Sequence, residues 1–323
     1  MKQTRRDFVR TLFVASQAAA ASRFLPINLF AGGIPTNNLN FLVVGDWGRQ
    51  GELDQREVAE QMGISAQNIG ARFVVSVGDN FYENGVASLT DDHWQKSFED
   101  VYTAPSLRVP WHVILGNHDY HGNCDAQLAY ALRSSRWTMP ARYYRQSHQI
   151  DHSTRADFFY LDTTPMIKVY HLRGFEGNIH ANVTRQDVPG QLAWFKAALA
   201  GSKAQWKIVF GHHPIYSGGE HGDQPELIES ILPLLREHNV HAYFNGHDHD
   251  LQHLVAGDVN LFCTGAGSQV RPTKNIEFTR FAKAQSGFTT VSLGADKMAV
   301  GMVDWRGKII YSTTISRGAP VPA

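Results

Sequence analysis

Five short clusters of polar residues carry the groups in this sequence that could do chemistry. Their carboxylates, imidazoles, amide oxygen and phenol, without a thiolate, are hard to borderline ligands that suit iron, manganese or zinc. Aspartate and histidine are costly to bury unless they are paired or bound to metal, so five such clusters are far more specific than one. The candidate ligands are Asp46, Asp79, Tyr82, Asn117, His118, His212, His213, His247 and His249.

This set holds more ligands than one metal ion needs. A carboxylate can bridge two ions with its oxygens, and two ions that share Asp79 are the natural arrangement. Ions about 3.5 to 4 Å apart are the usual machinery for in-line displacement at phosphorus. The residue types therefore predict a dinuclear centre for phosphoryl chemistry.

Each cluster follows a short apolar run and a glycine. The runs are mostly β-branched or aromatic and lack clean alternation, which predicts strands buried on both faces. Glycine allows a tight turn and a close approach of the backbone to a ligand. Polar residues just after strand carboxyl ends lie where sites assemble in open α/β sheets. The five segments are Asn40–Gly48, Phe73–Tyr82, Trp111–Tyr120, Lys207–Ser217 and Ala242–Asp250.

The segments between these runs carry helical patterns. Spaced Leu, Val, Met and Ile predict a helix from Glu52 to Ile69, and Gln191–Leu199 is a shorter candidate. Pro225–His238 opens with proline and is expected to kink at Pro233. Strands alternating with helices predict an α/β fold, in which residues 36–323 form a single catalytic domain.

The composition favours a globular protein with a small substrate. Lys+Arg and Asp+Glu both number 30, so the formal net charge is zero and no electrostatic footprint for nucleic acid or an anionic membrane is present. The two cysteines, Cys124 and Cys263, exclude a disulfide framework or a Cys-rich zinc site. Whether they pair with each other, and whether the protein is a monomer, stay open.

Residues 1–31 differ in kind from the rest of the chain. Arg5 and Arg6, followed by Phe8 and an alanine-rich run, predict a twin-arginine-type export signal and passage through the twin-arginine (Tat) export machinery. Gln17 and Arg23 interrupt the apolar run, which falls short of the roughly 18 apolar residues of a membrane span. The mature protein is expected to be periplasmic or secreted without a membrane segment. The cleavage position stays open.

The motifs GDWG, GDNFY, GNHD, GHHP and GHDH, in this order, resemble the signature of the dinuclear metallophosphoesterases. More narrowly, the sequence resembles the purple acid phosphatases, especially the compact tartrate-resistant type, from about Asn40 to the C-terminus. Other metallophosphoesterases usually begin with Asp-x-His, whereas Trp47 and Gly48 follow Asp46 here, and Tyr82 takes up the missing ligand position. The resemblance implies a metallophosphoesterase fold, a β-sheet sandwich flanked by helices, with the metal site at strand carboxyl ends.

Carried over residue by residue, the resemblance implies a purple Fe(III)–M(II) centre. The residues expected to bind Fe(III) are Asp46, Asp79, Tyr82 and His249. Those expected to bind the divalent ion, which is iron, zinc or manganese, are Asp79, Asn117, His212 and His247. In an extended segment residues i and i+2 share one face, so His247 and His249 can point the same way.

The resemblance also implies the activity, hydrolysis of small phosphate monoesters in mild acid by attack of a metal-bound hydroxide. His118 and His221 are the expected acids for the leaving group, with Glu220 as a polar companion.

Three further residues in these motifs are expected to support the site rather than to react. Asp119 is expected to orient His118 or a metal-bound water, Asp248 to be a structural carboxylate, and His213 to lie behind the ligands.

Two alternatives stay open at this point. The same centre could serve a phosphodiesterase or a pyrophosphatase, because the motifs do not report the leaving group. An iron pair could instead cycle with peroxide and generate reactive oxygen species, with phosphate only as an inhibitor.

Overall fold

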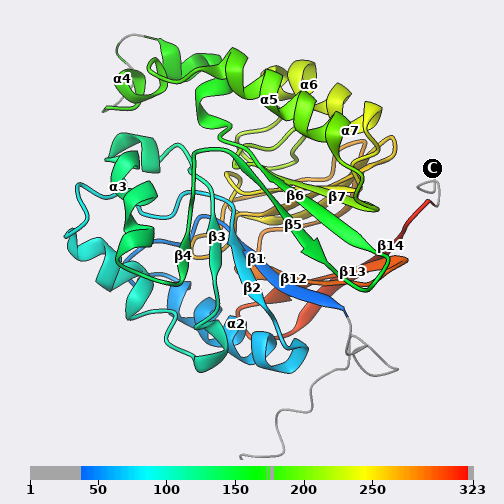
Figure 1. Cartoon of the computed structure of the whole chain (residues 1–323). Coiled ribbons are helices and arrows are strands. Elements are labelled where there is room, and N and C mark those ends of the chain that lie inside the picture. Colours follow the sequence, from blue (N-terminus) through cyan, green and yellow to red (C-terminus); the bar gives the residue numbers. More distant parts are fainter. Residues whose placement is uncertain (1–37, 173, 175–177, 319–323) are drawn as a thin grey trace, which may run out of the picture. The chain divides into compact units, whose positions relative to one another are not determined.

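Two β-sheets form the centre of the described chain (Figure 1). The computed structural model describes residues 38–172, 174 and 178–318, which lie within one compact unit, Ile34–Ala323. Among these residues each sheet has seven strands. The expected export signal, residues 1–31, lies outside the described residues.

The first sheet has the order β14-β13-β12-β1-β2-β3-β4. Strands β1 to β4 run parallel to one another. Strand β12 pairs antiparallel with β1, β13 with β12, and β14 with β13. The bounds are β1 Leu39–Val44, β2 Phe73–Ser76, β3 Trp111–Val113, β4 Trp137–Thr138, β12 Gly287–Leu293, β13 Lys297–Asp304 and β14 Ile309–Ser316.

The second sheet has the order β11-β9-β10-β8-β7-β6-β5. Strands β6, β7, β8 and β10 are parallel, whereas β5, β9 and β11 are antiparallel to their neighbours. The bounds are β5 Tyr144–Gln149, β6 Arg155–Tyr160, β7 Trp206–Phe210, β8 Ala242–Asn245, β9 Leu251–Ala256, β10 Val259–Thr264 and β11 Thr279–Lys283.

The two sheets pack on each other through aromatic side chains. The ring of Phe41 in β1 lies 5.3 Å from that of Phe158 in β6 and 6.4 Å from that of Phe210 in β7. All three rings are fully buried, and every residue of β1 and β8 is buried. The expected sandwich, with strands covered on both faces, is confirmed.

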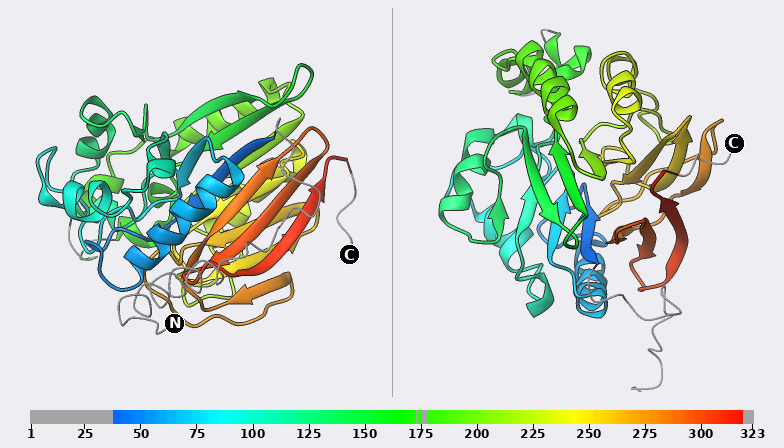
Figure 2. Two further views of the ribbon diagram at one scale, coloured as in Figure 1. Left: turned by 90° about the horizontal axis from the view of Figure 1, so that it is seen from below. Right: turned by 45° about the vertical axis from the view of Figure 1, so that its right-hand side comes forward.

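Helices cover the outer faces of the sheets. Helix α2, Gln55–Ile69, contacts β1 and β12, and Figure 2 shows it along the first sheet. Helix α5, Val188–Gly201, packs on the second sheet, where Phe195 meets Phe159 of β6. In Figure 1, α6 (Pro225–Ser230) and α7 (Leu232–Glu237) lie beside α5. None of the described helices has the length and apolar character needed to cross a membrane.

Shorter helices occupy the connections. They are the π-helix Trp94–Glu99, α3 Cys124–Ala129, α4 Ile179–Val183, and the 3₁₀ turns Pro105–Leu107, Asp119–His121, Tyr130–Leu132, Thr164–Met166 and Lys168–His171.

All three predicted helices differ in extent from the structure, and α2 begins at Gln55 rather than at Glu52. The segment expected to kink at Pro233 divides at Ile231 into α6 and α7, because proline has no N–H for the helical bond and its ring crowds the preceding turn. Helix α5 begins earlier than the predicted Gln191, because the Asp187 side chain accepts the Gly190 N–H and caps the first turn.

Candidate metal centre

The Tyr82 hydroxyl lies at the centre of one group of predicted ligands. It is 2.9 Å from Asp46 Oδ1, 2.9 Å from Asp79 Oδ2 and 3.0 Å from His249 Nε2. His249 Nε2 is also 3.5 Å from Asp46 Oδ1. The four residues follow β1, β2 and β8, and all four are buried. The fold thus brings together the residues expected to hold Fe(III).

A second group surrounds the Asn117 amide. Its Oδ1 atom is 3.1 Å from His212 Nε2 and 3.0 Å from His247 Nδ1. His212 Nε2 in turn lies 3.4 Å from Asp79 Oδ2. The His212 Nδ1–H donates to the Val77 carbonyl at 2.9 Å, which turns Nε2 toward the group as the atom that could bind a metal ion.

One oxygen belongs to both groups. Asp79 Oδ2 contacts Tyr82 on one side and His212 on the other. Donor atoms at right angles on one ion with bonds of about 2.1 Å lie about 3 Å apart, which is the spacing seen in each group. The residues present therefore fit two metal ions that share Asp79.

Three of these residues adopt a backbone conformation that side chains other than glycine rarely take. The φ angles of Asp46, Asp79 and His247 are 59°, 50° and 70°. Residues in this left-handed region cost free energy and persist where the surrounding structure holds them. Glycines make room for two of the carboxylates. A Cβ at Gly116 would lie 2.2 Å from Asp79 Oδ1, and one at Gly246 would lie 2.3 Å from Asp46 Oδ2.

Gly48 stands where the Asp-x-His pattern expected of other metallophosphoesterases would place a histidine. A Cβ at Gly48 would lie 1.7 Å from the carbonyl oxygen of Asn80, so no side chain fits there. The same close approach lets the Tyr82 N–H donate to the Gly48 carbonyl at 2.8 Å. The loops after β1 and β2 therefore touch backbone to backbone, and this contact places Tyr82 in the centre.

Comparison with known proteins identifies the family to which the chain belongs. Residues 39–251 match the calcineurin-like phosphoesterase family. Purple acid phosphatase 17 of Arabidopsis thaliana is 37% identical over 95% of this chain and 91% of its own. Tartrate-resistant acid phosphatase type 5 of Sus scrofa is 37% identical over 88% of this chain and 89% of its own. The chain belongs to the purple acid phosphatases.

The fold of this purple acid phosphatase is also found in a solved structure of a protein named as an anchor. GAP50, the anchor in the inner membrane complex of Plasmodium, matches with a TM-score of 0.75 at 26% identity, over 88% of this chain and 90% of that one. Since one fold can carry unrelated functions, the ligand geometry rather than the fold carries the catalytic argument.

Burial and neighbouring charges shift the pKa values of several residues in the centre. Burial opposes ionisation of Asp79, but nearby His212 and His118 outweigh it and lower its pKa below the usual range. Burial likewise opposes protonation of His212, yet Asp79 raises the pKa of this imidazole to about 9. Burial, then the carboxylates of Asp46 and Asp79, raise the pKa of the Tyr82 phenol well above its ordinary value. A phenolate here would need a strong cation beside it.

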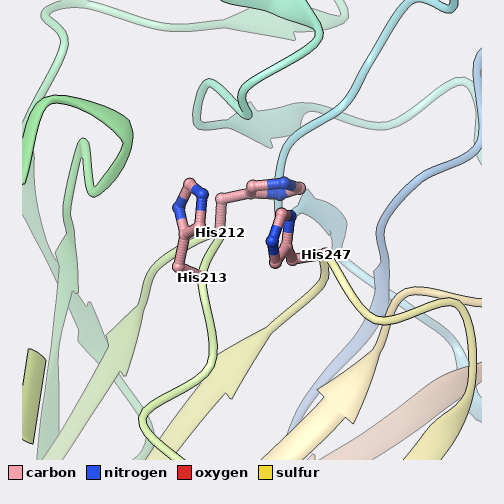
Figure 3. A group of neighbouring side chains, drawn as sticks. All are labelled: His212, His213 and His247. Carbon is pink, nitrogen blue, oxygen red and sulfur yellow. The ribbon is translucent and has the colours of Figure 1, made fainter. Parts of the chain in front are cut away.

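His213 lies beside the ligands without being free to join them. Figure 3 shows it grouped with His212 and His247 at the ends of β7 and β8, and one ligand atom from each lies within 4.8 Å of the others. However, His213 Nδ1 lies 3.0 Å from the Thr163 hydroxyl, and Nε2 lies 3.1 Å from that of Tyr170. Both ring nitrogens are engaged by hydroxyls, consistent with its expected place behind the ligands.

Both candidate acids border the centre. The His118 ring lies 4.3 Å from that of Tyr82, and its Nδ1 donates to the Glu83 carbonyl at 2.6 Å. The backbone N–H of His118 donates to Asp79 Oδ1 at 2.8 Å. The His221 ring stacks on that of His247 at 4.1 Å. Burial lowers the pKa of His221; Asp248 opposes this shift and Arg271 adds to it.

The two aspartates with expected supporting roles differ in outcome. Asp248 is structural as expected, because it accepts the His221 N–H at 2.9 Å and the Ser217 hydroxyl. Asp119 does not orient His118 through its carboxylate. It accepts from Gly116 N at 2.9 Å, Asn80 Nδ2 at 3.0 Å and Gln127 Nε2 at 2.8 Å, so it holds the turn after β3. Burial, then Asp79, raise its pKa to about 7.

Two arginines at the centre were not predicted. The guanidinium carbon of Arg49 lies 3.8 Å from the Tyr82 ring centroid, and its Nη1 is 2.7 Å from Glu83 Oε1. Arg271 Nη1 is 2.9 Å from His221 Nε2. Arg49 directly follows the GDWG motif, which was the available signal, whereas Arg271 lies in no motif.

The two cysteines are separate, buried thiols. Cys124 Sγ donates to the Asp119 carbonyl at 3.4 Å, and Cys263 Sγ donates to the Asp248 carbonyl at 3.2 Å. The open question of a disulfide between them is answered in the negative for this structure.

Proposed function

We propose that this purple acid phosphatase hydrolyses phosphate monoesters at an Fe(III)–M(II) centre. Asp46, Asp79, Tyr82 and His249 would hold Fe(III), and the divalent ion, iron, zinc or manganese, would lie among Asp79, Asn117, His212 and His247. The observation that carries the proposal is the single oxygen of Asp79 in contact with both donor groups. Bound ions would supply Lewis acidity and a water of lowered pKa.

The chain's own residues supply orientation and protons. The His118 N–H fixes Asp79 Oδ1, which leaves Oδ2 to face both groups. His118 and His221 would donate the proton to the leaving group, and each lies at the edge of a different donor group. Glu220, 58% exposed, is a companion of Arg271 rather than of the ligands, since its Oε2 atom lies 3.6 Å from Arg271 Nη1.

The experiment that tests this proposal is the visible spectrum of the purified protein beside that of Tyr82→Phe, with metal content and p-nitrophenyl phosphate turnover measured on both. A mid-visible band present in the wild type and absent in the variant is the expected result. A colourless wild type with two metals and full turnover would retain the phosphoesterase and reject Fe(III)–phenolate. Rates on bis-p-nitrophenyl phosphate, pyrophosphate and peroxide would separate the diesterase, pyrophosphatase and redox alternatives.

We also propose that residues 1–31 direct twin-arginine export of a single catalytic domain, residues 36–323. The support is the Arg5–Arg6 pair ahead of a short apolar run. The Arg5→Lys, Arg6→Lys variant is expected to accumulate in the cytoplasm, whereas the wild type is recovered from the periplasm or the medium. Equal export of both would reject the twin-arginine route.

A further inference from the structure

The loop that carries His221 is fixed by its backbone. Asp248 accepts the His221 N–H at 2.9 Å and the hydroxyl of Ser217. Gly219 lies so close to it that a Cβ there would be 2.4 Å from Asp248 Cγ. The loop is therefore held against the GHDH segment through its backbone and Ser217.

A second segment is tied to both this loop and the ligands. The Arg271 N–H donates to the carbonyl of His249 at 2.9 Å, and the Lys274 N–H donates to that of Gly218 at 2.9 Å. This anchoring delivers the Arg271 guanidinium to the His221 ring, with Nη1 2.9 Å from Nε2. A guanidinium can only donate, so His221 Nε2 accepts in this arrangement.

The Arg271 charge is available to a ligand. Its nearest carboxylate, Glu220 Oε2 at 3.6 Å, belongs to a side chain that is 58% exposed, and such exposed pairs contribute little. The buried Asp248 is already occupied by the loop backbone and Ser217. Arg49 differs, because its side chain is 11% exposed, stacks on Tyr82 and pairs with Glu83. Arg271 itself is 30% exposed and stays charged at any pH of interest.

The position of this charge points to the leaving group. The His221 ring stacks on that of His247, one of the residues expected to hold the divalent ion, so the Arg271 guanidinium beside His221 lies at the border of this donor group. We propose that Arg271 determines specificity by binding an anionic group on the leaving alcohol. The preferred substrates are then phosphate monoesters whose alcohol carries a carboxylate or a second phosphate near the ester oxygen. This inference rests on the proposed monoesterase function and on the position of His221 at the edge of the metal centre.

The test uses a matched pair of substrates, 2-phosphoglycerate and glycerol 2-phosphate, which differ in a carboxylate on the alcohol. We expect Arg271→Gln to lower the ratio of kcat/KM for 2-phosphoglycerate to that for glycerol 2-phosphate roughly tenfold, mainly through KM, since a charge-assisted contact is lost. Arg271→Lys should retain most of the ratio. Lys274→Gln, which removes a charge from the same segment, should change the ratio less than roughly threefold.

Three outcomes would overturn the inference. They are a ratio in Arg271→Gln equal to that of the wild type, an equal loss in Lys274→Gln, and a wild-type ratio that does not fall when salt screens the contact. The salt series needs no variant and so decides the matter even if Arg271→Gln does not fold, while an intact visible band certifies a folded variant. A wild type that hydrolyses neither ester would instead reject the monoesterase function.

Discussion

The two halves of the metal centre differ in the charge of their donors. The Tyr82 half adds a carboxylate, a phenol oxygen and one imidazole to the shared Asp79, whereas the Asn117 half adds an amide oxygen and two imidazoles. Anionic oxygen donors suit a hard, highly charged ion, and neutral donors suit a borderline divalent ion. This difference favours Fe(III) in the Tyr82 half. The charge of the donors, rather than their number, therefore distinguishes the two metal positions.

The surroundings of the halves differ in the same sense. Arg49 and Glu83 cover Tyr82 with an ion pair whose arginine is only 11% exposed. The Asn117 half is bordered by His221 and the more exposed Arg271. The arginine beside the Tyr82 half is therefore the more enclosed, and the arginine beside the Asn117 half is the more accessible.

The largest expected effect comes from the residue that both halves share. Asp79→Asn keeps the shape but removes the anionic bridge, so both ions should be lost together and turnover should fall by roughly 10³-fold or more, because each ion stabilises transition-state charge. Metal analysis and p-nitrophenyl phosphate kinetics measure this. Retention of one ion at full occupancy would show that the halves are independent.

A change confined to the Asn117 half should separate the two ions. Asn117→Ala removes the oxygen that lies between His212 and His247, so affinity for the divalent ion should weaken at least roughly 10- to 100-fold, with a matching loss of turnover at limiting metal. The visible band should persist, in contrast to Tyr82→Phe. Spectra recorded during titration with zinc measure both effects. Loss of the band in Asn117→Ala would contradict the division into halves.

A subtler change should act on the Tyr82 half without removing a ligand. The Arg49 cation lies 3.8 Å from the Tyr82 ring centroid, where it stabilises the electrons of a phenolate. Arg49→Met should therefore raise the energy of the donor electrons and move the visible band to longer wavelength, while Arg49→Lys should move it less. An unmoved band in Arg49→Met would show that the guanidinium only packs there.

The ligands and their strands could be predicted because the pattern that encodes them is local. A buried apolar run, a glycine and a polar cluster occur within ten residues of one another, and the strand ends then meet at one edge of the fold. The assignment of His247 and His249 to different ions came from resemblance, and the structure places their ring nitrogens in different donor groups, with Asn117 and Tyr82.

The remaining features depend on contacts between distant residues. Arg271 contacts His221, 50 residues away in sequence, and Arg49 contacts Glu83, 34 residues away. No periodicity in the sequence predicts either contact. Nine of the fourteen described strands were not predicted. In β9, for example, buried Gln252 and His253 interrupt the apolar character. The expectation that Asp119 orients His118 was wrong, because a carboxylate beside a histidine in sequence does not show which groups it accepts from in the fold.

The smallest effect is expected at the outer edge of the Asn117 half, where two carboxylates differ in burial. Asp248 is 1% exposed and holds the His221 backbone, so Asp248→Asn should lower kcat/KM by roughly tenfold through misplacement of His221. Glu220 is 58% exposed and lies 3.6 Å from the guanidinium of Arg271, so Glu220→Gln should change kcat/KM by less than roughly threefold. Steady-state kinetics on p-nitrophenyl phosphate compare the two variants. A larger loss of kcat/KM in Glu220→Gln than in Asp248→Asn would make Glu220 a participant in proton transfer. The reaction would then take place closer to the exposed Glu220 than the positions of the buried ligands indicate.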